Sequence, residues 1–194
     1  MIVAKFVLAA LIGYFIGAIP VALIIGKRMA GIDISKRGSG NIGGTNVLRV
    51  VGFKAGVITM ALDLAKAIVP VILARFIIGD SVLNIAGFTL DWRWGQVITA
   101  LMVMVGHNWS VYIKFRGGKG AATGTGVMLP LVPIPLLAAL SVFLVTFLVT
   151  RYVSLGSILA AVMLIVTQLV LHRGEAFNGD AAPVTWLCLI GALL

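Results

Sequence analysis

The chain has 194 residues, of which 61% are hydrophobic and 11% are charged, and it contains 23 glycines. A soluble domain of this length cannot bury so much apolar surface, and ordinary soluble domains carry about 25% charged residues. These values exclude a soluble single domain and a disordered chain, and the single Cys188 excludes a disulfide scaffold. The net charge of +9 is what basic cytoplasmic loops give an integral membrane protein, so it does not indicate a nucleic-acid partner.

Several apolar stretches meet or approach the length of about 20 residues that a membrane-spanning helix needs. They are Phe6–Ile25, Ala55–Ile78, Trp94–Val111, Ala121–Thr150, Leu155–Leu171 and Pro183 to the end. The stretch Ala121–Thr150 contains three prolines, each of which removes a hydrogen-bond donor and clashes with the preceding turn, so a broken helical hairpin is predicted there. We expect one all-α transmembrane domain over residues 1–194, a compact bundle of about seven helices, some short or broken.

The charges of the connecting loops alternate in sign along the chain. Lys27–Lys54 and His107–Lys119 are rich in lysine and arginine, whereas Gly79–Trp94 and His172–Ala182 carry more acidic than basic residues. Because Lys and Arg favour cytoplasmic loops, the two basic loops are predicted to face the cytoplasm and the N-terminus the outside. The broken hairpin would return the chain to the cytoplasm at Arg151.

The first basic loop contains a glycine-rich polar cluster between Gly38 and Asn46. It formally contains G-x-G-x-x-G, but no strand precedes it and Asp63 lies within an apolar span, so a dinucleotide-binding fold is not expected. Glycines let backbone N–H groups point at an anion, and Arg49 adds a side chain suited to bidentate phosphate recognition. We interpret the cluster as an anion site, and the alternative is a loop of small residues for close helix packing.

The second basic loop ends in Phe115–Gly120, where glycines and Lys119 directly precede a predicted helix. These are the ingredients of phosphate capture at a helix N-terminus, although Gly120 after the lysine rules out a Walker A loop. The alternative is a flexible basic loop. A third polar cluster, Arg151–Ser157, starts another predicted helix, and its serines are candidates for helix caps or for the same site.

Asp63 and Lys66 lie three residues apart in the second predicted span and therefore share a helix face. Intramembrane ionisable residues usually pair or line a cavity, so a structural ion pair and support of an active site are both open. The sequence has neither Cys/His metal spacing nor a G-x-S-x-G nucleophile elbow, so neither metal nor acyl-enzyme chemistry is expected. His107 is the candidate general base near the cytoplasmic interface, and a substrate phosphate is the alternative.

Together these motifs resemble those of bacterial acyl-phosphate-dependent glycerol-3-phosphate acyltransferases. The resemblance rests on Ser39–Arg49, Gly106–Gly120, Arg151–Ser157 and Asp63-Leu64-Ala65-Lys66, and it departs at Gly44 and Ser110, where the family commonly has Ala and Pro. It implies a seven-helix enzyme of the bacterial plasma membrane that needs no cofactor and has its site at the cytoplasmic face. The implied substrates are acyl phosphate and glycerol 3-phosphate, and the products are lysophosphatidic acid and phosphate. Besides membrane lipid, the enzyme that makes acyl phosphate is a candidate partner.

The resemblance also implies roles for individual residues. The expected catalytic residues are Ser39, Arg49, Lys119 and Ser157, to which the position of His107 adds the candidate base. The expected substrate-binding residues are Gly40, Asn41, Gly43, Thr45, Asn46, Gly117, Gly118, Gly120 and Ser154. The alternative function is a transporter of a phosphorylated solute or anion. Such a transporter is expected to have its site near the membrane midplane and an internal sequence repeat, and no repeat is visible in this sequence. A lipid-binding scaffold would leave the polar clusters unexplained.

The last apolar stretch, Pro183–Leu194, reaches about 18 Å as a helix at about 1.5 Å per residue, short of a bilayer core of about 30 Å. The family that the chain resembles continues there into a cytoplasmic segment of Arg-His-Arg-x-Asn type. We therefore expect the 194-residue form to be truncated in its last helix and to have little or no activity.

Overall fold

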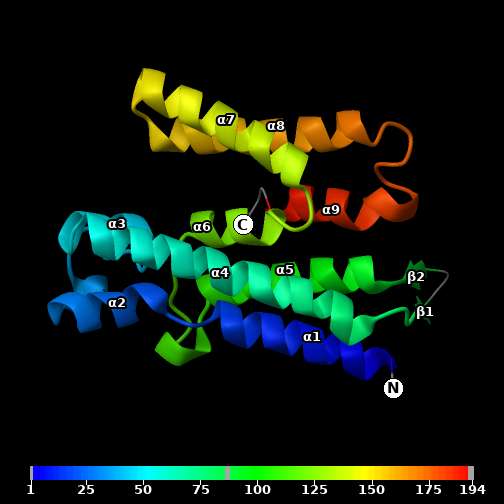
Figure 1. Cartoon of the computed structure of the whole chain (residues 1–194), viewed down its shortest axis with the longest axis horizontal. Helices are drawn as coiled ribbons and strands as arrows, with labels where there is room; N and C mark the ends of the chain where they lie inside the picture. Colours follow the sequence, from blue (N-terminus) through cyan, green and yellow to red (C-terminus); the bar gives the residue numbers. More distant parts are fainter. Residues whose placement is uncertain (1, 86–87, 192–194) are drawn as a thin grey trace. The chain divides into compact units, whose positions relative to one another are not determined.

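The computed structural model describes residues 2–85 and 88–191. The α-helices of this part of the chain are α1 (Ile2–Gly17), α2 (Val21–Ala30), α3 (Gly44–Val50), α4 (Phe53–Ile78), α5 (Trp92–Asn108), α6 (Ala121–Met128), α7 (Pro133–Thr150), α8 (Val153–Leu171) and α9 (Ala182–Gly191). Short 3-10 helices are η1 (Ile34–Lys36), η2 (Val111–Ile113) and η3 (Gly179–Ala181), and the strands are β1 (Leu83–Ile85) and β2 (Phe88–Leu90). The all-α class is confirmed, with a small hairpin added (Figure 1).

Four helical stretches within the described residues are long and apolar enough to cross a membrane. They are Ile2–Ala30, Phe53–Ile78, Pro133–Thr150 and Val153–Leu171. The predicted span Trp94–Val111 forms α5, a helix of 17 residues that ends at Asn108. The chain is therefore an integral membrane protein that combines long apolar helices with shorter ones.

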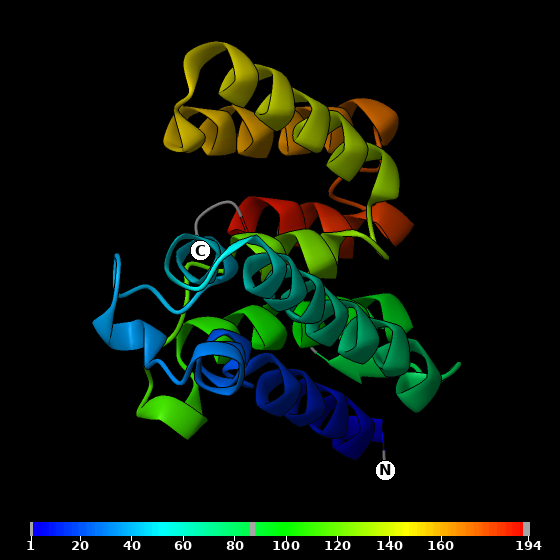
Figure 2. The same cartoon turned by 60° about the vertical axis from the view of Figure 1, so that its left-hand side comes forward.

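The chain folds as two compact units, the first reaching Val127 and the second starting at Met128. In the first unit, α1, α4 and α5 lie side by side (Figures 1 and 2). Helices α1 and α5 approach closely. A Cβ atom added at Gly17 would lie 2.3 Å from Val103 O, and one added at Gly106 would lie 2.2 Å from Tyr14 O. Small residues are a common means of bringing helix backbones together in membranes, where lipid gives no hydrophobic driving force.

The first predicted span, Phe6–Ile25, is broken between α1 and α2. Pro20 has no N–H group and interrupts the helical ladder. Two carbonyl groups at the break accept hydrogen bonds from side chains of other elements: Lys66 Nζ donates to Ile19 O at 2.8 Å, and Ser110 Oγ donates to Ala18 O at 2.5 Å. The break therefore connects α1 to a charged residue of α4 and to the segment after α5.

An apolar cluster and the β1–β2 hairpin close the end of the first unit at which α1 begins (Figure 1). Phe6 packs there with Ala74 and Ile78 of α4, which are fully buried. Lys5 Nζ donates to Ile78 O at 3.2 Å and to Ser81 Oγ at 2.8 Å. The predicted outer loop, Gly79–Trp94, thus contains an antiparallel strand pair that the sequence analysis did not anticipate.

The proline-rich stretch Ala121–Thr150 is interrupted as predicted. Helix α6 ends at Met128 and α7 begins at Pro133, so Pro130 lies in the connection and Pro135 in the first turn of α7. Proline is tolerated in a first turn because its missing N–H would have no helical partner there.

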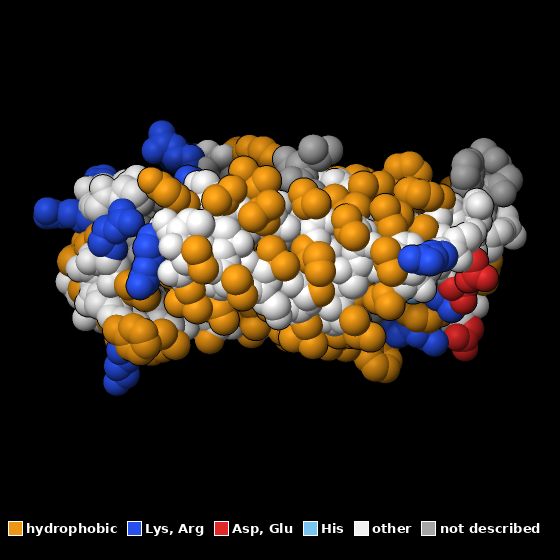
Figure 3. All heavy atoms as spheres, turned by 90° about the horizontal axis from the view of Figure 1, so that it is seen from above, with side chains coloured by type: hydrophobic (Ala, Val, Ile, Leu, Met, Phe, Trp, Pro, Cys, Tyr) orange, Lys and Arg blue, Asp and Glu red, His pale blue; other side chains and the backbone are white. Residues whose placement is uncertain are grey.

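The second unit consists of α7, α8 and α9. Helices α7 and α8 pack together around Gly156, where an added Cβ would lie 3.1 Å from Phe143 Cδ2. Between α8 and α9, Gln168 Nε2 donates to Thr185 Oγ1 at 3.3 Å. Many other side chains of α7 and α8 are exposed and apolar, such as Val149 of α7 at 78% exposure. Figure 3 shows hydrophobic side chains along the middle of the face that it views. Such a surface fits contact with lipid.

Candidate active site

Asn46 is the centre of the first motif loop, residues 34–46. Its Oδ1 accepts a hydrogen bond from Ser39 N at 3.0 Å, while Nδ2 lies within donor distance of Ile34 O, Arg37 O and Asn41 O at 3.2, 3.0 and 3.0 Å. Only 2% of Asn46 is exposed. Asn46 is among the residues expected to bind substrate, and in the structure its amide is bonded within the loop.

The other predicted residues of this motif lie closer to solvent. Gly40 has a φ of +71°, which glycine adopts without strain. The members that are exposed or half-buried are Ser39, Gly40, Asn41, Gly43, Thr45 and Arg49. Of these, Arg49 lies in the last turn of α3. The loop thus carries hydroxyl, amide and guanidinium groups at its surface.

Helix α3, which carries Arg49, is anchored on α4 by close glycine contacts. A Cβ on Gly56 would lie 2.4 Å from Leu48 Cβ, and one on Gly44 would lie 2.4 Å from Met60 Cγ. Gly44 is one of the positions where the family that the chain resembles commonly has alanine. The glycine fits its neighbour here, because Met60 occupies the space that an alanine methyl group would need.

The second motif loop, residues 110–120, folds back on the end of α5. Ser110 N donates to Arg116 O at 3.1 Å, and Phe115 N donates to Ser110 O at 2.8 Å. Lys119 is exposed at the end of this loop, and Gly120, with a φ of +72°, directly precedes α6. The predicted arrangement of a lysine before a helix is therefore present.

Gly117 and Gly118 are glycines because the backbone and ring of His107 lie so close. A Cβ on Gly117 would lie 2.1 Å from His107 O, and one on Gly118 would lie 2.4 Å from His107 Nε2 and 2.7 Å from Ile42 O. Gly118 N also donates to His107 O at 3.2 Å. Because Ile42 belongs to the first motif loop, the two motif loops meet at Gly118.

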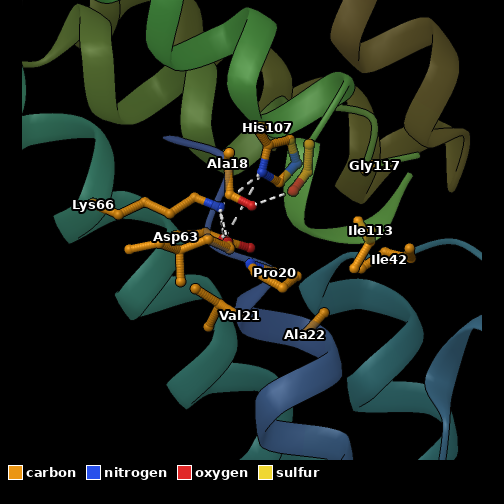
Figure 4. A pocket seen from close by; sticks show the side chains of 13 residues that line it. Ala18, Pro20, Val21, Ala22, Ile42, Asp63, Lys66, His107, Ile113 and Gly117 are labelled. Carbon is orange, nitrogen blue, oxygen red and sulfur yellow. Dashed lines mark hydrogen bonds and ion pairs between the residues drawn. The ribbon is translucent and has the colours of Figure 1, made fainter. Parts of the chain in front are cut away.

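Three ionisable side chains, Asp63, Lys66 and His107, lie together beneath this meeting point and are called the buried trio below (Figure 4). Lys66 Nζ is 2.9 Å from Asp63 Oδ1 and 3.1 Å from His107 Nδ1. The predicted common face of Asp63 and Lys66 is confirmed as an ion pair. The contact with His107 was not predicted, because nothing in the spacing along the chain relates α4 to α5.

Two cavities adjoin the motif loops. One of about 10 Å³ borders the buried trio, about the smallest space that holds one water molecule. The other, of about 470 Å³, is lined by Lys27 of α2, by Asp33 after that helix, by Ile42 of the first motif loop and by Ile113 and Arg116 of the second. Hydrogen bonds donated by Ser35 hold the pKa of Asp33 below its ordinary value. Only the larger cavity has room for a small organic phosphate.

The third motif belongs to the second unit. Ser154 and Ser157 are exposed in the first turns of α8, and Ser157 Oγ donates to Val153 O at 3.0 Å. Arg151, which joins α7 to α8, has a φ of +61°. The roles that the resemblance implies for the two serines stay predictions.

Among the described residues, no group of three His, Cys, Asp or Glu side chains could hold a metal ion. The polar groups that the two motif loops present to solvent include cations, hydroxyls and amides. Within the same part of the chain, neither Arg49 nor Lys119 forms an ion pair with a carboxylate. Exposed basic groups without a carboxylate partner are suited to binding anions.

The apolar helices and this basic loop site define an integral membrane protein with a candidate anion-binding site formed by loops at the ends of its helices. The sequence matches the family described as glycerol-3-phosphate acyltransferase over residues 7–194. The chain belongs to this family of membrane acyltransferases.

Named relatives agree with that assignment. Glycerol-3-phosphate acyltransferase 2 of Moorella thermoacetica is 37% identical over 86% of this chain and 79% of its own length. The acyltransferase of Anaeromyxobacter dehalogenans strain 2CP-1 is 39% identical over 94% and 84%. The crystal structure of PlsY, an integral membrane glycerol 3-phosphate acyltransferase in its glycerol 3-phosphate form, is 32% identical, with a TM-score of 0.80 over 97% of this chain and 84% of that one.

Proposed function

We propose that the protein transfers a fatty acyl group from acyl phosphate to glycerol 3-phosphate, giving lysophosphatidic acid and phosphate. The observation that carries the proposal is the meeting of the two motif loops at Gly118. Arg49, on the helix after the first loop, and Lys119, in the second loop, are exposed cations of the same unit, and neither has a carboxylate partner among the described residues. Family membership and the crystal structures of PlsY in glycerol 3-phosphate and lysophosphatidic acid forms support it.

The reaction needs two phosphate-bearing substrates to lie close together. The acceptor hydroxyl oxygen forms a bond to the acyl carbonyl carbon, and the bond from that carbon to the phosphate oxygen breaks. Phosphate leaves with the electron pair, and the hydroxyl proton passes to a phosphate oxygen. Holding the two reactants in this geometry can supply a large share of the rate acceleration.

In this proposal, Arg49 and Lys119 offset the charge of the two phosphates, and the motif loops supply donors. Ser39, Asn41, Gly43 and Thr45 contribute from the first loop, and Gly117 and Gly120 from the second. Gly40 and Gly118, whose N–H groups are bonded to Arg37 O and His107 O, shape the two loops. Ser154 and Ser157 contribute from the third motif. Preorganised donors of this kind stabilise charge that develops in the transition state. Acyl phosphate is an activated donor, so the proposal includes no cofactor.

We place the site at the cytoplasmic face of the bacterial plasma membrane. The basic loops Lys27–Lys54 and His107–Lys119 support this orientation, because cytoplasmic loops are enriched in Lys and Arg. Acyl phosphate would then be delivered from the cytoplasm by the enzyme that makes it.

The test uses purified protein in lipid vesicles with labelled glycerol 3-phosphate and either acyl phosphate or acyl-coenzyme A. Labelled lysophosphatidic acid is expected with acyl phosphate only. Lys119→Ala and Arg49→Lys should each lower kcat/KM by roughly 10- to 100-fold, since a charged hydrogen bond contributes about 1.5–3 kcal/mol and a lysine cannot reproduce the planar fork of arginine.

Lys54→Ala serves as the matched control, because Lys54 is an exposed lysine at the start of α4. It should leave kcat/KM unchanged. Transfer from acyl-coenzyme A alone would show that the donor is wrong while the acyltransferase class holds. Unchanged kinetics in both site variants would remove Arg49 and Lys119 from the site.

A further inference from the structure

We propose that Lys66 is a positioning residue for the acyl-transfer site, because it fixes the imidazole of His107 as the Nε2–H tautomer beneath the contact between the two motif loops. The effect on turnover rests on the proposed function. The tautomer itself can be measured without any assay of acyl transfer.

The hydrogen bonds of Lys66 determine which nitrogen of His107 carries the proton. An ammonium group has three protons and no lone pair, so it can only donate. Lys66 Nζ lies within hydrogen-bond distance of Ile19 O at 2.8 Å and of His107 Nδ1 at 3.1 Å, and it forms an ion pair with Asp63 Oδ1 at 2.9 Å. Because Nδ1 accepts through its lone pair, the proton of the neutral ring lies on Nε2.

The three side chains of the buried trio are largely shielded from solvent, which limits the partners that they can have. Asp63, Lys66 and His107 are 2%, 9% and 8% exposed. An ionised group without partners is costly in such surroundings, and breaking a buried pair on one side leaves the other charge uncompensated. Lys66 is largely shielded from bulk water, so its hydrogen bonds to Ile19 O and His107 Nδ1 and its ion pair with Asp63 connect the α1–α2 break, α4 and α5.

The ring of His107 transmits this geometry to the motif loops. Gly118 packs so closely that an added Cβ would lie 2.4 Å from His107 Nε2 and 2.7 Å from Ile42 O of the first loop. The backbone of His107 contacts the same loop, since its carbonyl accepts a hydrogen bond from Gly118 N. A shift of the ring would therefore displace the loop that carries Lys119.

The same geometry argues against His107 as the general base, which was its expected role. Its Nδ1 lone pair faces the Lys66 ammonium and its Nε2 carries a proton, so neither nitrogen is free to accept the hydroxyl proton of the substrate. The adjoining cavity of about 10 Å³ has no room for glycerol 3-phosphate. His107 is thus placed to hold the loops, and Lys66 to hold His107.

The first test is nitrogen-15 NMR of histidine-labelled protein in lipid bilayers. The chain has two histidines, so His172→Gln leaves His107 as the only labelled ring. Nε2 should be protonated and Nδ1 unprotonated. The double variant Asp63→Asn/Lys66→Met removes both charges together and should give a mixture of tautomers, whereas Lys54→Met should not. A protonated Nδ1 in the parent protein would overturn the proposal.

The second test compares two replacements of His107. In His107→Asn the side-chain carbonyl can accept from Lys66 in place of Nδ1, whereas in His107→Leu nothing can. A positioning role predicts that the Asn variant keeps most of kcat and that the Leu variant loses up to about 100-fold, the effect of a displacement of about 1 Å in an active site. Equal losses in both variants would overturn the positioning role, because a general base is lost in either.

Thermal unfolding identifies variants that fail to fold, and for those the comparison passes to Asp63→Asn/Lys66→Met. This double variant should lower kcat more than it raises the KM for glycerol 3-phosphate. An unchanged kcat there would overturn the proposal. If the parent protein transfers no acyl group from acyl phosphate, the proposed function fails, while the NMR result still decides whether Lys66 sets the tautomer.

Discussion

Asn46 shows how a polar residue in a binding motif can act on the loop that presents the other binding groups. Its side chain is bonded to backbone groups of Ser39, Ile34, Arg37 and Asn41, and it is almost fully buried. These bonds hold a loop whose glycines would otherwise leave it mobile. The exposed groups of Ser39 and Asn41 are therefore fixed by a residue that does not itself face solvent.

Asn46→Ala should destabilise the protein by about 1–3 kcal/mol, because it leaves buried backbone groups of the first motif loop without partners. Thermal unfolding in detergent measures this loss, and the KM for glycerol 3-phosphate should rise with it. Asn178→Ala is the matched control, since Asn178 is exposed and makes no side-chain cap. An Asn46→Ala protein as stable as the parent would mean that the loop holds its shape without this side chain.

The crossing of α1 and α5 depends on glycine at the level of whole elements. Gly17 and Gly106 each face a backbone carbonyl of the other helix at a distance that leaves no room for a methyl group. The segments that follow these helices carry the α1–α2 break and the second motif loop. The separation of α1 and α5 therefore also sets the separation of Ile19 from His107.

Gly17→Ala and Gly106→Ala should each lower stability by roughly 1–3 kcal/mol, the usual cost of overpacking. The neighbouring atoms are backbone, so a side-chain rotation cannot relieve the contact. Gly124→Ala in α6 is the control, because its added methyl group would meet only Met104 Cε, at 3.9 Å. Thermal unfolding of the three variants tests this, and equal midpoints would contradict the close crossing.

Apolar length located the main helices because a backbone in lipid must bond within its own segment. The three prolines of Ala121–Thr150 also located the interruption before Pro133. The break at Pro20 was not predicted, since one proline in an apolar stretch is equally compatible with a kinked helix. The hairpin at Leu83–Leu90 was missed because its strands are only three residues each.

Part of the candidate site could also be predicted from the sequence. Its glycines, hydroxyls and cations mark the motif loops, and the spacing of Asp63 and Lys66 gave their common face. Which of these residues face solvent and which hold the loops together could not be predicted, because that depends on contacts between distant segments. Asn46 and Gly118 were expected to meet substrate, yet the first bonds its own loop and the second packs on His107 and Ile42.

Orientation in the membrane is a property of the whole molecule, and single cysteines test it. Cys188 is buried and is replaced by alanine in the background. Cysteines at Lys36, Lys114 and Arg151 should resist an impermeant thiol reagent in intact cells and react after permeabilisation, as expected for cytoplasmic loops rich in Lys and Arg. A cysteine at Ser81, in the predicted outer loop, should react in both conditions.

The pattern of labelling separates the parts of this prediction. Labelling of the Arg151 position alone in intact cells would mean that Ala121–Thr150 crosses the membrane once. Labelling of both the Lys36 and Lys114 positions in intact cells would mean that the first unit has the opposite orientation to the predicted one.

The break at Ala18–Pro20 has a consequence for how the protein is made. Its carbonyl groups are bonded by Lys66 and Ser110, which are synthesised 47 and 92 residues after their acceptors. When the first apolar stretch leaves the ribosome, neither partner exists, so in lipid Ala18 O lacks the bond from Ser110 and Ile19 O has only its local bond from Val21 N. The break can reach its final form only once residue 110 has been inserted. The segment that is synthesised first is thus among the last to reach its final structure. The first span of the nascent protein has to stay in a different, temporary conformation until the later helices are inserted.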